Sequence, residues 1–157
     1  MVKYKTYVLK RMNMPFTIVF VRDNFDETLI EALNRVVNEI DKYLKNVEEK
    51  FSPFLPDSLV SKHTDIGEVL QEDFFDLEYQ EVYSRSIIAK KETHGLFNPF
   101  FGGKYNPTGF VKGWAIENAF MKYIKPLIDN NIIEAGAING AGDIQVGTKS
   151  NSNFSWK

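Results

Sequence analysis

Alternating polar and apolar positions predict two strands at the start of the chain. Residues 3–9 alternate in this way, and residues 17–21 form a run of β-branched and apolar side chains. Both patterns are typical of strands. Asn13, Met14 and Pro15 lie between them and predict the break that separates the two strands.

Apolar residues at three- and four-residue steps predict three main helices. The longest covers residues 27–50, and Pro53 follows its end. The second covers residues 73–91, with acidic side chains in its first turns and lysines in its last turn, as the helix dipole favours. The third begins near Phe110 and stops before Asn130.

A second group of strands is predicted after the third helix. Residues 132–139 are predicted to form a strand, residues 140–143 a turn, and residues 144–147 the start of a return strand. Residues 154–157 have the pattern of a further strand. We therefore expect a helical middle with strands on both sides of it in the sequence.

Composition narrows the classes of function. The 157 residues correspond to about one domain, and 13 Phe, 7 Tyr and 2 Trp provide enough apolar surface for a core and a lined pocket. The net charge of −2 gives no electrostatic footprint for nucleic acid. The chain has no cysteine, which excludes disulfides, thiolate metal sites and a thiol nucleophile. The first residues have no long apolar region, so we expect neither a signal peptide nor a membrane span, and a cytoplasmic location.

Residues 105–117 carry the most informative local chemistry. Asn106 and Pro107 favour an extended backbone, and Thr108 with Gly109 can cap the helix that follows. Backbone amides, the positive end of the helix dipole and the ammonium group of Lys112 favour a phosphate or pyrophosphate at this helix start. The alternative is a capped amphipathic helix with an ordinary surface lysine, and the local sequence leaves both interpretations open.

Five blocks in the same order resemble one family. Residues 93–99 resemble its T-x-G-x-F-D-P block, residues 106–115 its D-P-S-G-x-x-K-G-W-A block, and residues 137–147 its N-x-G-G-D-x-x-x-G block. Upstream, residues 12–17 are similar to an M-G-T-x-F opening, and residues 48–58 to the end of the family's first long helix. The family is ApbE, the FAD:protein FMN transferases, and the blocks span nearly the whole chain.

The resemblance implies both a fold and a reaction. The fold is α+β, an antiparallel sheet flanked by three main helices in a T-fold-like arrangement, with residues 1–157 forming a single ApbE-like domain that is incomplete at its C-terminus. The reaction is Mg2+-dependent cleavage of FAD with transfer of FMN to a threonine of a target flavoprotein. The alternatives are an FAD pyrophosphatase, which releases FMN and AMP, and a truncated, non-catalytic flavin-binding homologue.

The family's contacts carry over position by position. Its flavin-contacting methionine corresponds to Met14, with Met12 as the alternative, and its loop aspartate is replaced by Asn106. Ala141 stands where glycine is usual. No catalytic residue is assigned, and Asp143 is equally open to interpretation as a turn carboxylate. The resemblance implies FAD contacts at Met14, Phe54, Asn106, Lys112, Asn139, Gly140, Gly142 and Asp143, and a Mg2+ ligand in the carbonyl oxygen of Gly109.

The family's remaining metal ligands lie in a further segment that these 157 residues do not contain. Mg2+ demands near-octahedral coordination, so one backbone carbonyl does not make a site. A second chain, a homodimer partner or the rest of a longer protein would have to supply the other oxygen ligands.

Overall fold

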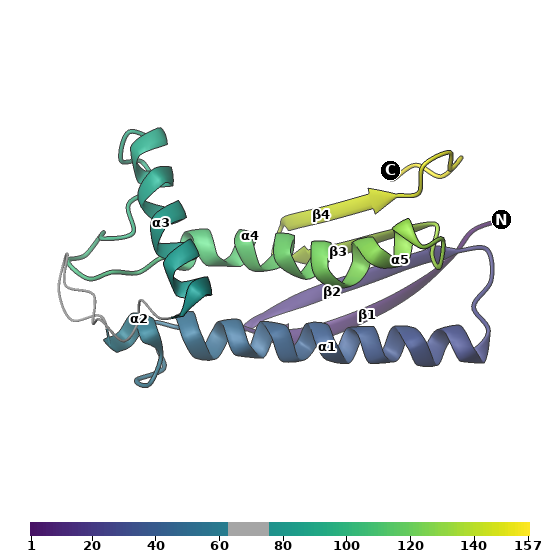
Figure 1. Cartoon of the computed structure of the whole chain (residues 1–157), viewed down its shortest axis with the longest axis horizontal. Coiled ribbons are helices and arrows are strands. Elements are labelled where there is room, and N and C mark those ends of the chain that lie inside the picture. Colours follow the sequence, from purple (N-terminus) through teal and green to yellow (C-terminus); the bar gives the residue numbers. More distant parts are fainter. Residues whose placement is uncertain (63–75) are drawn as a thin grey trace. The chain divides into compact units, whose positions relative to one another are not determined.

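A computed structural model describes residues 1–62 and 76–157 of the chain (Figure 1). These residues form two compact units. We call Met1–Lys45 with Ala115–Lys157 the sheet unit, and Asn46–Trp114 the aromatic unit. The expected single domain over residues 1–157 stays a prediction.

The sheet unit contains a four-stranded antiparallel sheet. Its strands are β1 (Lys3–Arg11), β2 (Met14–Arg22), β3 (Ala135–Gly140) and β4 (Asp143–Thr148), paired in the order β1-β2-β3-β4. Both predicted pairs of strands are therefore present, and β2 and β3 join the two pairs in the centre of the sheet.

The turn between β1 and β2 begins one residue earlier than predicted and ends at Asn13, so Met14 and Pro15 belong to β2. Met12 and Asn13 have φ values of 52° and 57°, so they form the two-residue turn, and Arg11 pairs with Met14 on either side of it. Positive φ at both central positions matches the right-handed twist of a hairpin. Pro15 fits inside β2 because the pairing with β3 begins only at Phe16, so the missing amide hydrogen leaves no gap in that ladder.

All three predicted main helices are present. The first is α1 (Glu27–Phe51), and the Asp26 carboxylate accepts a hydrogen bond from the Leu29 amide at 2.8 Å at its start. A short helix, α2 (Leu59–Lys62), follows. The second predicted helix is α3 (Leu77–Glu92), and residues 73–75 of that prediction lie outside the described residues.

The third predicted helix changes its hydrogen-bond pattern along its length. It consists of α4 (Thr108–Ala119), the π-helical segment η2 (Phe120–Ile124) and α5 (Lys125–Asp129). Pro126 lies in the first turn of α5 and has no amide hydrogen. The Lys125 amide reaches back five residues to the Phe120 carbonyl, which is the wider spacing of a π-turn.

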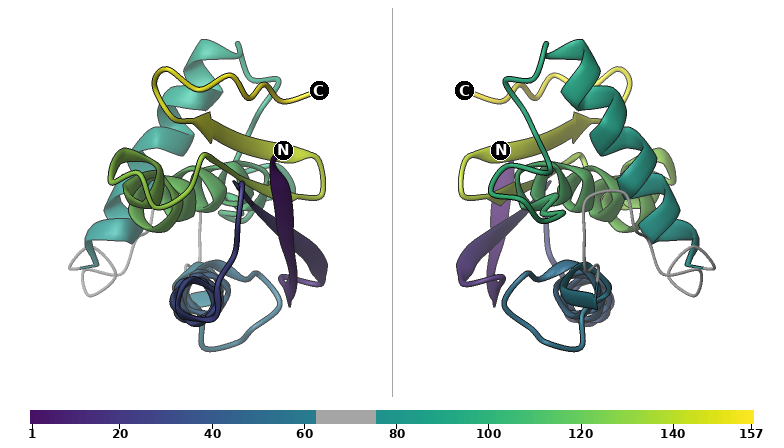
Figure 2. Two further views of the ribbon diagram at one scale, coloured as in Figure 1. Left: turned by 90° about the vertical axis from the view of Figure 1, so that its right-hand side faces the viewer. Right: turned by 90° about the vertical axis from the view of Figure 1, so that its left-hand side faces the viewer.

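Helices pack closely on one face of the sheet because Gly136, Gly140 and Gly147 leave room for them. A Cβ atom on Gly136 would lie 2.5 Å from Ile124 Cγ2, and one on Gly147 would lie 2.8 Å from the ring of Phe120. Figure 2 shows α1 almost end-on beside the strands. Arg11 binds both carboxylate oxygens of Asp41 in α1 at 2.7 Å, which fixes the end of β1 to that helix.

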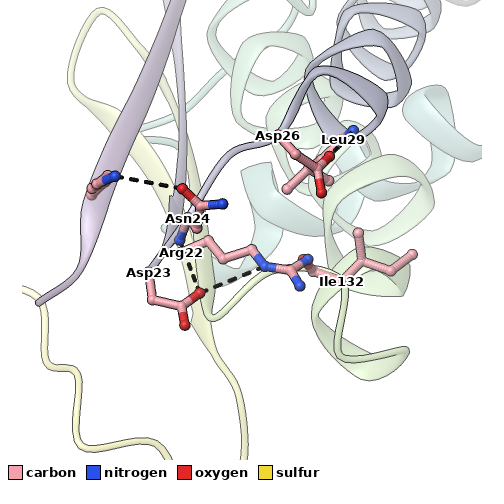
Figure 3. A network of polar contacts seen from close by, with 7 residues as sticks. Arg22, Asp23, Asn24, Asp26, Leu29 and Ile132 are labelled. Carbon is pink, nitrogen blue, oxygen red and sulfur yellow. Dashed lines mark hydrogen bonds and ion pairs between the residues drawn. The ribbon is translucent and has the colours of Figure 1, made fainter.

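A polar network joins the end of β2 to the segment that leads into β3 (Figure 3). Arg22 donates to the carbonyl oxygen of Ile132 and lies 3.8 Å from the Asp23 carboxylate. The same Asp23 oxygen accepts the Asn24 amide at 2.9 Å. These contacts hold the connection between β2 and α1.

Residues 154–157 do not form the predicted strand. The segment instead packs through its aromatic side chains. Phe154 meets the ring of Tyr4 edge-on at 6.2 Å, and the indole nitrogen of Trp156 donates to the Gly147 carbonyl at 3.4 Å. Ring contacts replace the ladder that the sequence pattern suggested.

The α+β class with an antiparallel sheet and three main helices is confirmed. Within the described residues, no helix combines the length and the apolar character needed to cross a membrane.

Candidate functional site

The sheet unit carries five of the predicted contact residues at one end of its sheet. β2 begins at Met14 and runs antiparallel to β3, so the start of β2 and the end of β3 lie at the same end. Phe16 and Gly140 are direct partners there. The register thus gathers residues that are far apart in the sequence, namely Met14, Asn139, Gly140, Gly142 and Asp143.

The turn between β3 and β4 is a tight hairpin. Ala141 and Gly142 have φ values of 49° and 99°, and the Asn139 side-chain oxygen accepts the Gly142 amide at 3.0 Å. Asn139 therefore closes the turn from within. Ala141 adopts a backbone conformation that glycine reaches at lower cost, so the alanine is accommodated with some strain. Asp143 follows as an exposed carboxylate at the start of β4.

Gly140 has a packing role that the sequence did not show. A Cβ atom at this position would lie 2.7 Å from the ring of Phe16 and 2.8 Å from Ile116 Cδ1. The residue is buried, and the space beside its Cα is filled by these two side chains. Gly140 is therefore required for packing, and its backbone lies between Phe16 of β2 and Asp143 of β4 in the sheet.

In the aromatic unit, the start of α4 is capped by Asn106. The side-chain oxygen of Asn106 accepts the Thr108 amide at 3.1 Å and also the Thr108 hydroxyl. The Pro107 carbonyl accepts the amides of Phe110 and Val111 at 2.8 and 3.0 Å. Thr108 is the first residue of the helix rather than its cap.

The cap at the start of α4 weakens the case for an anion-binding site there. Three amides of the first turn, those of Thr108, Phe110 and Val111, already have acceptors within the chain. A phosphate at this point would gain fewer backbone hydrogen bonds than a bare helix start offers. The half-buried Lys112 is then the strongest attraction for an anion in this turn.

A buried tyrosine positions the loop before α4. Tyr105 is 2% exposed, its hydroxyl lies 3.3 Å from the Ser86 hydroxyl, and its ring packs on Phe100 at 5.6 Å. Burial raises the pKa of Tyr105, so its phenol stays protonated. The Asn106 amide donates to the Pro99 carbonyl at 2.6 Å and closes the loop. These contacts fix the residue that caps α4.

The helix itself is held by a contact that sequence reasoning missed. Trp114 donates its indole hydrogen to the Glu81 carboxylate in α3 at 3.1 Å, and Arg85 binds the same oxygen at 3.2 Å. The guanidinium group of Arg85 lies over the Phe110 ring at 5.4 Å. Periodicity identifies Trp114 as a core residue, but no local pattern links it to a glutamate 33 positions earlier.

Phe54 has an unusual environment for a large aromatic side chain. It is 84% exposed and follows the end of α1, in a segment held by the Ser58 hydroxyl, which donates to the Ser52 carbonyl at 2.6 Å. Ser58 is itself buried. The backbone is thus fixed while the ring of Phe54 extends into solvent.

The described residues do not fit a Mg2+ site. The Gly109 carbonyl lies in the first turn of α4, where the amide four residues later is its helical partner. No cluster of three or more His, Cys, Asp or Glu side chains with metal-binding geometry occurs in residues 1–62 and 76–157. His63 lies outside these residues.

One open pocket of about 880 Å³ lies in the sheet unit, away from the predicted contacts. Tyr4, Phe154 and Trp156 supply its aromatic lining and Glu134 a carboxylate. None of the nine residues predicted to contact FAD or Mg2+ lines this pocket.

No protein-family model and no curated protein matches the sequence. Solved structures do match the fold. The flavin transferase ApbE from Vibrio cholerae superposes with a TM-score of 0.69 at 14% identity, covering 95% of this chain. The flavinyl transferase ApbE from Pseudomonas stutzeri, in its apo form, gives 0.67 at 12% identity over 94%.

The chain spans 60% of the length of each of these two proteins. The identities are low, so the likeness concerns the fold. The resemblance indicated by the sequence blocks is confirmed at that level: along almost its whole length, the chain has the fold of the ApbE flavin transferases.

Proposed function

We propose that the chain acts on FAD in a flavin-transfer reaction, in which FMN passes to a threonine hydroxyl of a target flavoprotein and AMP is released. The observation that carries the proposal is the fold match with structures named flavin transferases, over 95% of the chain. The motif blocks add support because two of them include the start of α4 and the β3–β4 turn, where polar groups are exposed.

Each unit offers FAD a different kind of contact. In the aromatic unit, Phe54 presents an exposed ring on a fixed backbone, which suits stacking on the flavin ring. Lys112 supplies a cation for the pyrophosphate. In the sheet unit, the Asp143 carboxylate is exposed at the start of β4 and can bind polar groups of the cofactor.

The metal is the part of the reaction that these residues do not supply. Mg2+ takes oxygen ligands, and Gly109 offers one carbonyl that is already engaged in its helix. Activity therefore depends on ligands from another polypeptide segment. Residues of this chain bind and orient FAD, and the proposal assigns none of them as a catalytic acid, base or nucleophile.

The experiment is an incubation of the protein with FAD and a threonine-containing target protein, with Mg2+ or with EDTA. AMP is measured by chromatography, and FMN attachment by intact mass. Covalent FMN on the target together with AMP supports transfer, whereas AMP with free FMN supports the pyrophosphatase alternative. Saturable FAD binding without either product favours a binding homologue, and the absence of both binding and turnover overturns the proposal.

A matched pair of lysine variants tests the role of the helix start. Lys112→Gln removes the cation in the first turns of α4, and Lys104→Gln removes an exposed cation in the preceding loop. We expect about tenfold weaker FAD binding or turnover in Lys112→Gln, which corresponds to about 1.4 kcal/mol, and little change in Lys104→Gln. Equal effects of the two changes would indicate general electrostatics without a pyrophosphate contact.

A further inference from the structure

Two side-chain contacts join α3 to the first turns of α4, and both lie within the aromatic unit. The Glu81 carboxylate accepts the indole hydrogen of Trp114 at 3.1 Å. The guanidinium group of Arg85 lies 5.4 Å from the centre of the Phe110 ring. The two residues of α3 are four positions apart, and so are their partners in α4. This spacing places both contacts on one face of each helix.

One carboxylate oxygen of Glu81 serves both contacts. Oε1 accepts a hydrogen bond from Trp114 Nε1 at 3.1 Å and another from Arg85 Nη1 at 3.2 Å. The first bond orients the indole ring, and the second holds the guanidinium group beside the Phe110 ring. Removal of the Glu81 carboxylate therefore weakens both contacts with α4, although Glu81 belongs to another helix.

The first turns of α4 need such contacts because their own sequence does little to order them. Gly109 and Gly113 both lie in these turns, and glycine is among the weakest helix formers. The cap from Asn106 reaches only the first residue of the helix. Contacts from α3 therefore help to order residues 110–114, the segment that contains Lys112.

The same contacts determine the side of α4 on which Lys112 lies. With about 3.6 residues per turn, Phe110 and Trp114 lie about 40° apart around the helix axis, and Lys112 lies about 160° from each. Trp114 is buried and Lys112 is half-buried. Two contacts on one side fix the rotation of the helix about its axis, so they set the direction in which the ammonium group of Lys112 is presented.

We propose that Glu81 is a positioning residue for FAD binding, which acts through Trp114 and Arg85 on the placement of Lys112. This role rests on the proposed function, in which the Lys112 cation meets the pyrophosphate. The side chains of Glu81 and Arg85 are 47% and 45% exposed. An ion pair that is this exposed adds little to stability, so removal of Glu81 should leave the chain folded.

A cycle of variants tests this role through its dependence on Lys112. FAD binding is measured by flavin fluorescence for the unmodified chain, Glu81→Ala, Lys112→Gln and the double variant. We expect about fivefold weaker binding in Glu81→Ala, about tenfold in Lys112→Gln, and no further loss in the double variant, because a misplaced cation and a missing one have the same consequence. Glu92→Ala, at an exposed glutamate at the end of α3, is the matched control and should bind FAD normally.

The outcomes separate this role from general destabilisation. Glu81→Gln keeps an acceptor for the indole and loses the charge that attracts Arg85, so it should weaken binding less than Glu81→Ala does. A double variant with the product of both losses, about fiftyfold, would overturn the proposal because Glu81 would then act independently of Lys112. Normal binding by Glu81→Ala would overturn this role alone, whereas a chain that binds no FAD overturns the proposed function together with it.

The contact between Glu81 and Trp114 can also be tested without FAD. The chain contains two tryptophans, so Trp156→Phe leaves the Trp114 indole as the one indole N–H signal in a nitrogen–proton correlation spectrum. In this background Glu81→Ala should shift the signal, because the indole loses its acceptor, and Glu92→Ala should leave it in place. A Trp114 signal that Glu81→Ala does not move would overturn the proposal, whatever the result with FAD.

Discussion

The sheet unit and the aromatic unit are stabilised in different ways. In the sheet unit, helices approach the strands closely because Gly136, Gly140 and Gly147 leave no side chain between them. In the aromatic unit, large rings fill the core: Phe51 stacks on Tyr79 at 6.1 Å. Close packing in the sheet unit depends on glycines, which have no side chain, whereas packing in the aromatic unit depends on large aromatic side chains.

The difference shows which changes each part of the candidate site tolerates. In the sheet unit the predicted contacts lie on turns and strand ends, so their geometry follows from backbone pairing. In the aromatic unit they depend on side-chain hydrogen bonds such as the cap from Asn106 to Thr108. Truncation of a large side chain should lower the stability of the aromatic unit most. Addition of a methyl group at a packed glycine should lower the stability of the sheet unit.

The largest effect is expected from Phe51→Ala. Phe51 is 2% exposed and also meets Trp114 edge-on at 5.6 Å, so the truncation leaves a cavity among aromatic rings. We expect a loss of about 3–5 kcal/mol in the free energy of unfolding, measured by urea denaturation. Phe101→Ala removes the same ring from a site that is 86% exposed and should change stability by less than about 0.5 kcal/mol.

An intermediate effect is expected from Gly136→Ala. The added methyl group would meet Ile124 Cγ2 at 2.5 Å and Ile133 Cδ1 at 3.2 Å, and overpacking of this kind costs about 1–3 kcal/mol. Gly113→Ala in α4 is the control, because no atom lies within 4 Å of its added methyl group. Helix propensity predicts a gain of about 0.5–1 kcal/mol there. Equal responses at the two glycines would contradict the close packing of the sheet unit.

The smallest expected effect is the pH dependence of stability that arises from two aspartates, Asp41 and Asp76. The hydrogen bond from Arg11 is the main cause that lowers the pKa of Asp41, and in the aromatic unit Lys50 and the Tyr79 amide lower the pKa of Asp76 although burial opposes them. A lowered folded-state pKa adds stability above the unfolded value of about 3.9, and this is lost as pH falls through the folded value.

Asp41→Asn tests this dependence. Both partners are about a third exposed or less, so we expect a loss of about 1 kcal/mol at pH 7 and a smaller difference from the unmodified chain near pH 2. Urea midpoints at the two pH values measure it. A difference that is the same at both values would show that the carboxylate charge is not the cause.

Much of the fold follows from local patterns in the sequence. The apolar stripe of α1 repeats over seven turns, and turn residues separate the strands, so the elements could be predicted. The errors lie where tertiary contacts or turn geometry outweigh the pattern. Met12 has no turn preference yet takes positive φ, and residues 154–157 exchange a strand for ring contacts with Tyr4.

The sequence predicts which elements carry the residues of the candidate site, but not the contacts that surround those residues. The sequence places Asn106 before a helix, and this placement is observed. It places Gly140 within a turn over residues 140–143, whereas Gly140 ends β3 and the turn consists of Ala141 and Gly142. Nothing local shows that Asn106 occupies the Thr108 amide, or that Phe16 and Ile116 fill the space beside Gly140. Those facts depend on partners that the chain brings together only on folding.

The most direct test of the account is an equilibrium titration with FAD, followed by flavin fluorescence. We expect saturable binding that Phe54→Ala weakens by about tenfold, because the flavin loses its stacking contact with the exposed ring. Leu96→Ala, at a residue that is 94% exposed in the same unit, should leave binding unchanged. Absence of saturable binding, or equal binding by the unmodified chain and Phe54→Ala, would contradict this expectation.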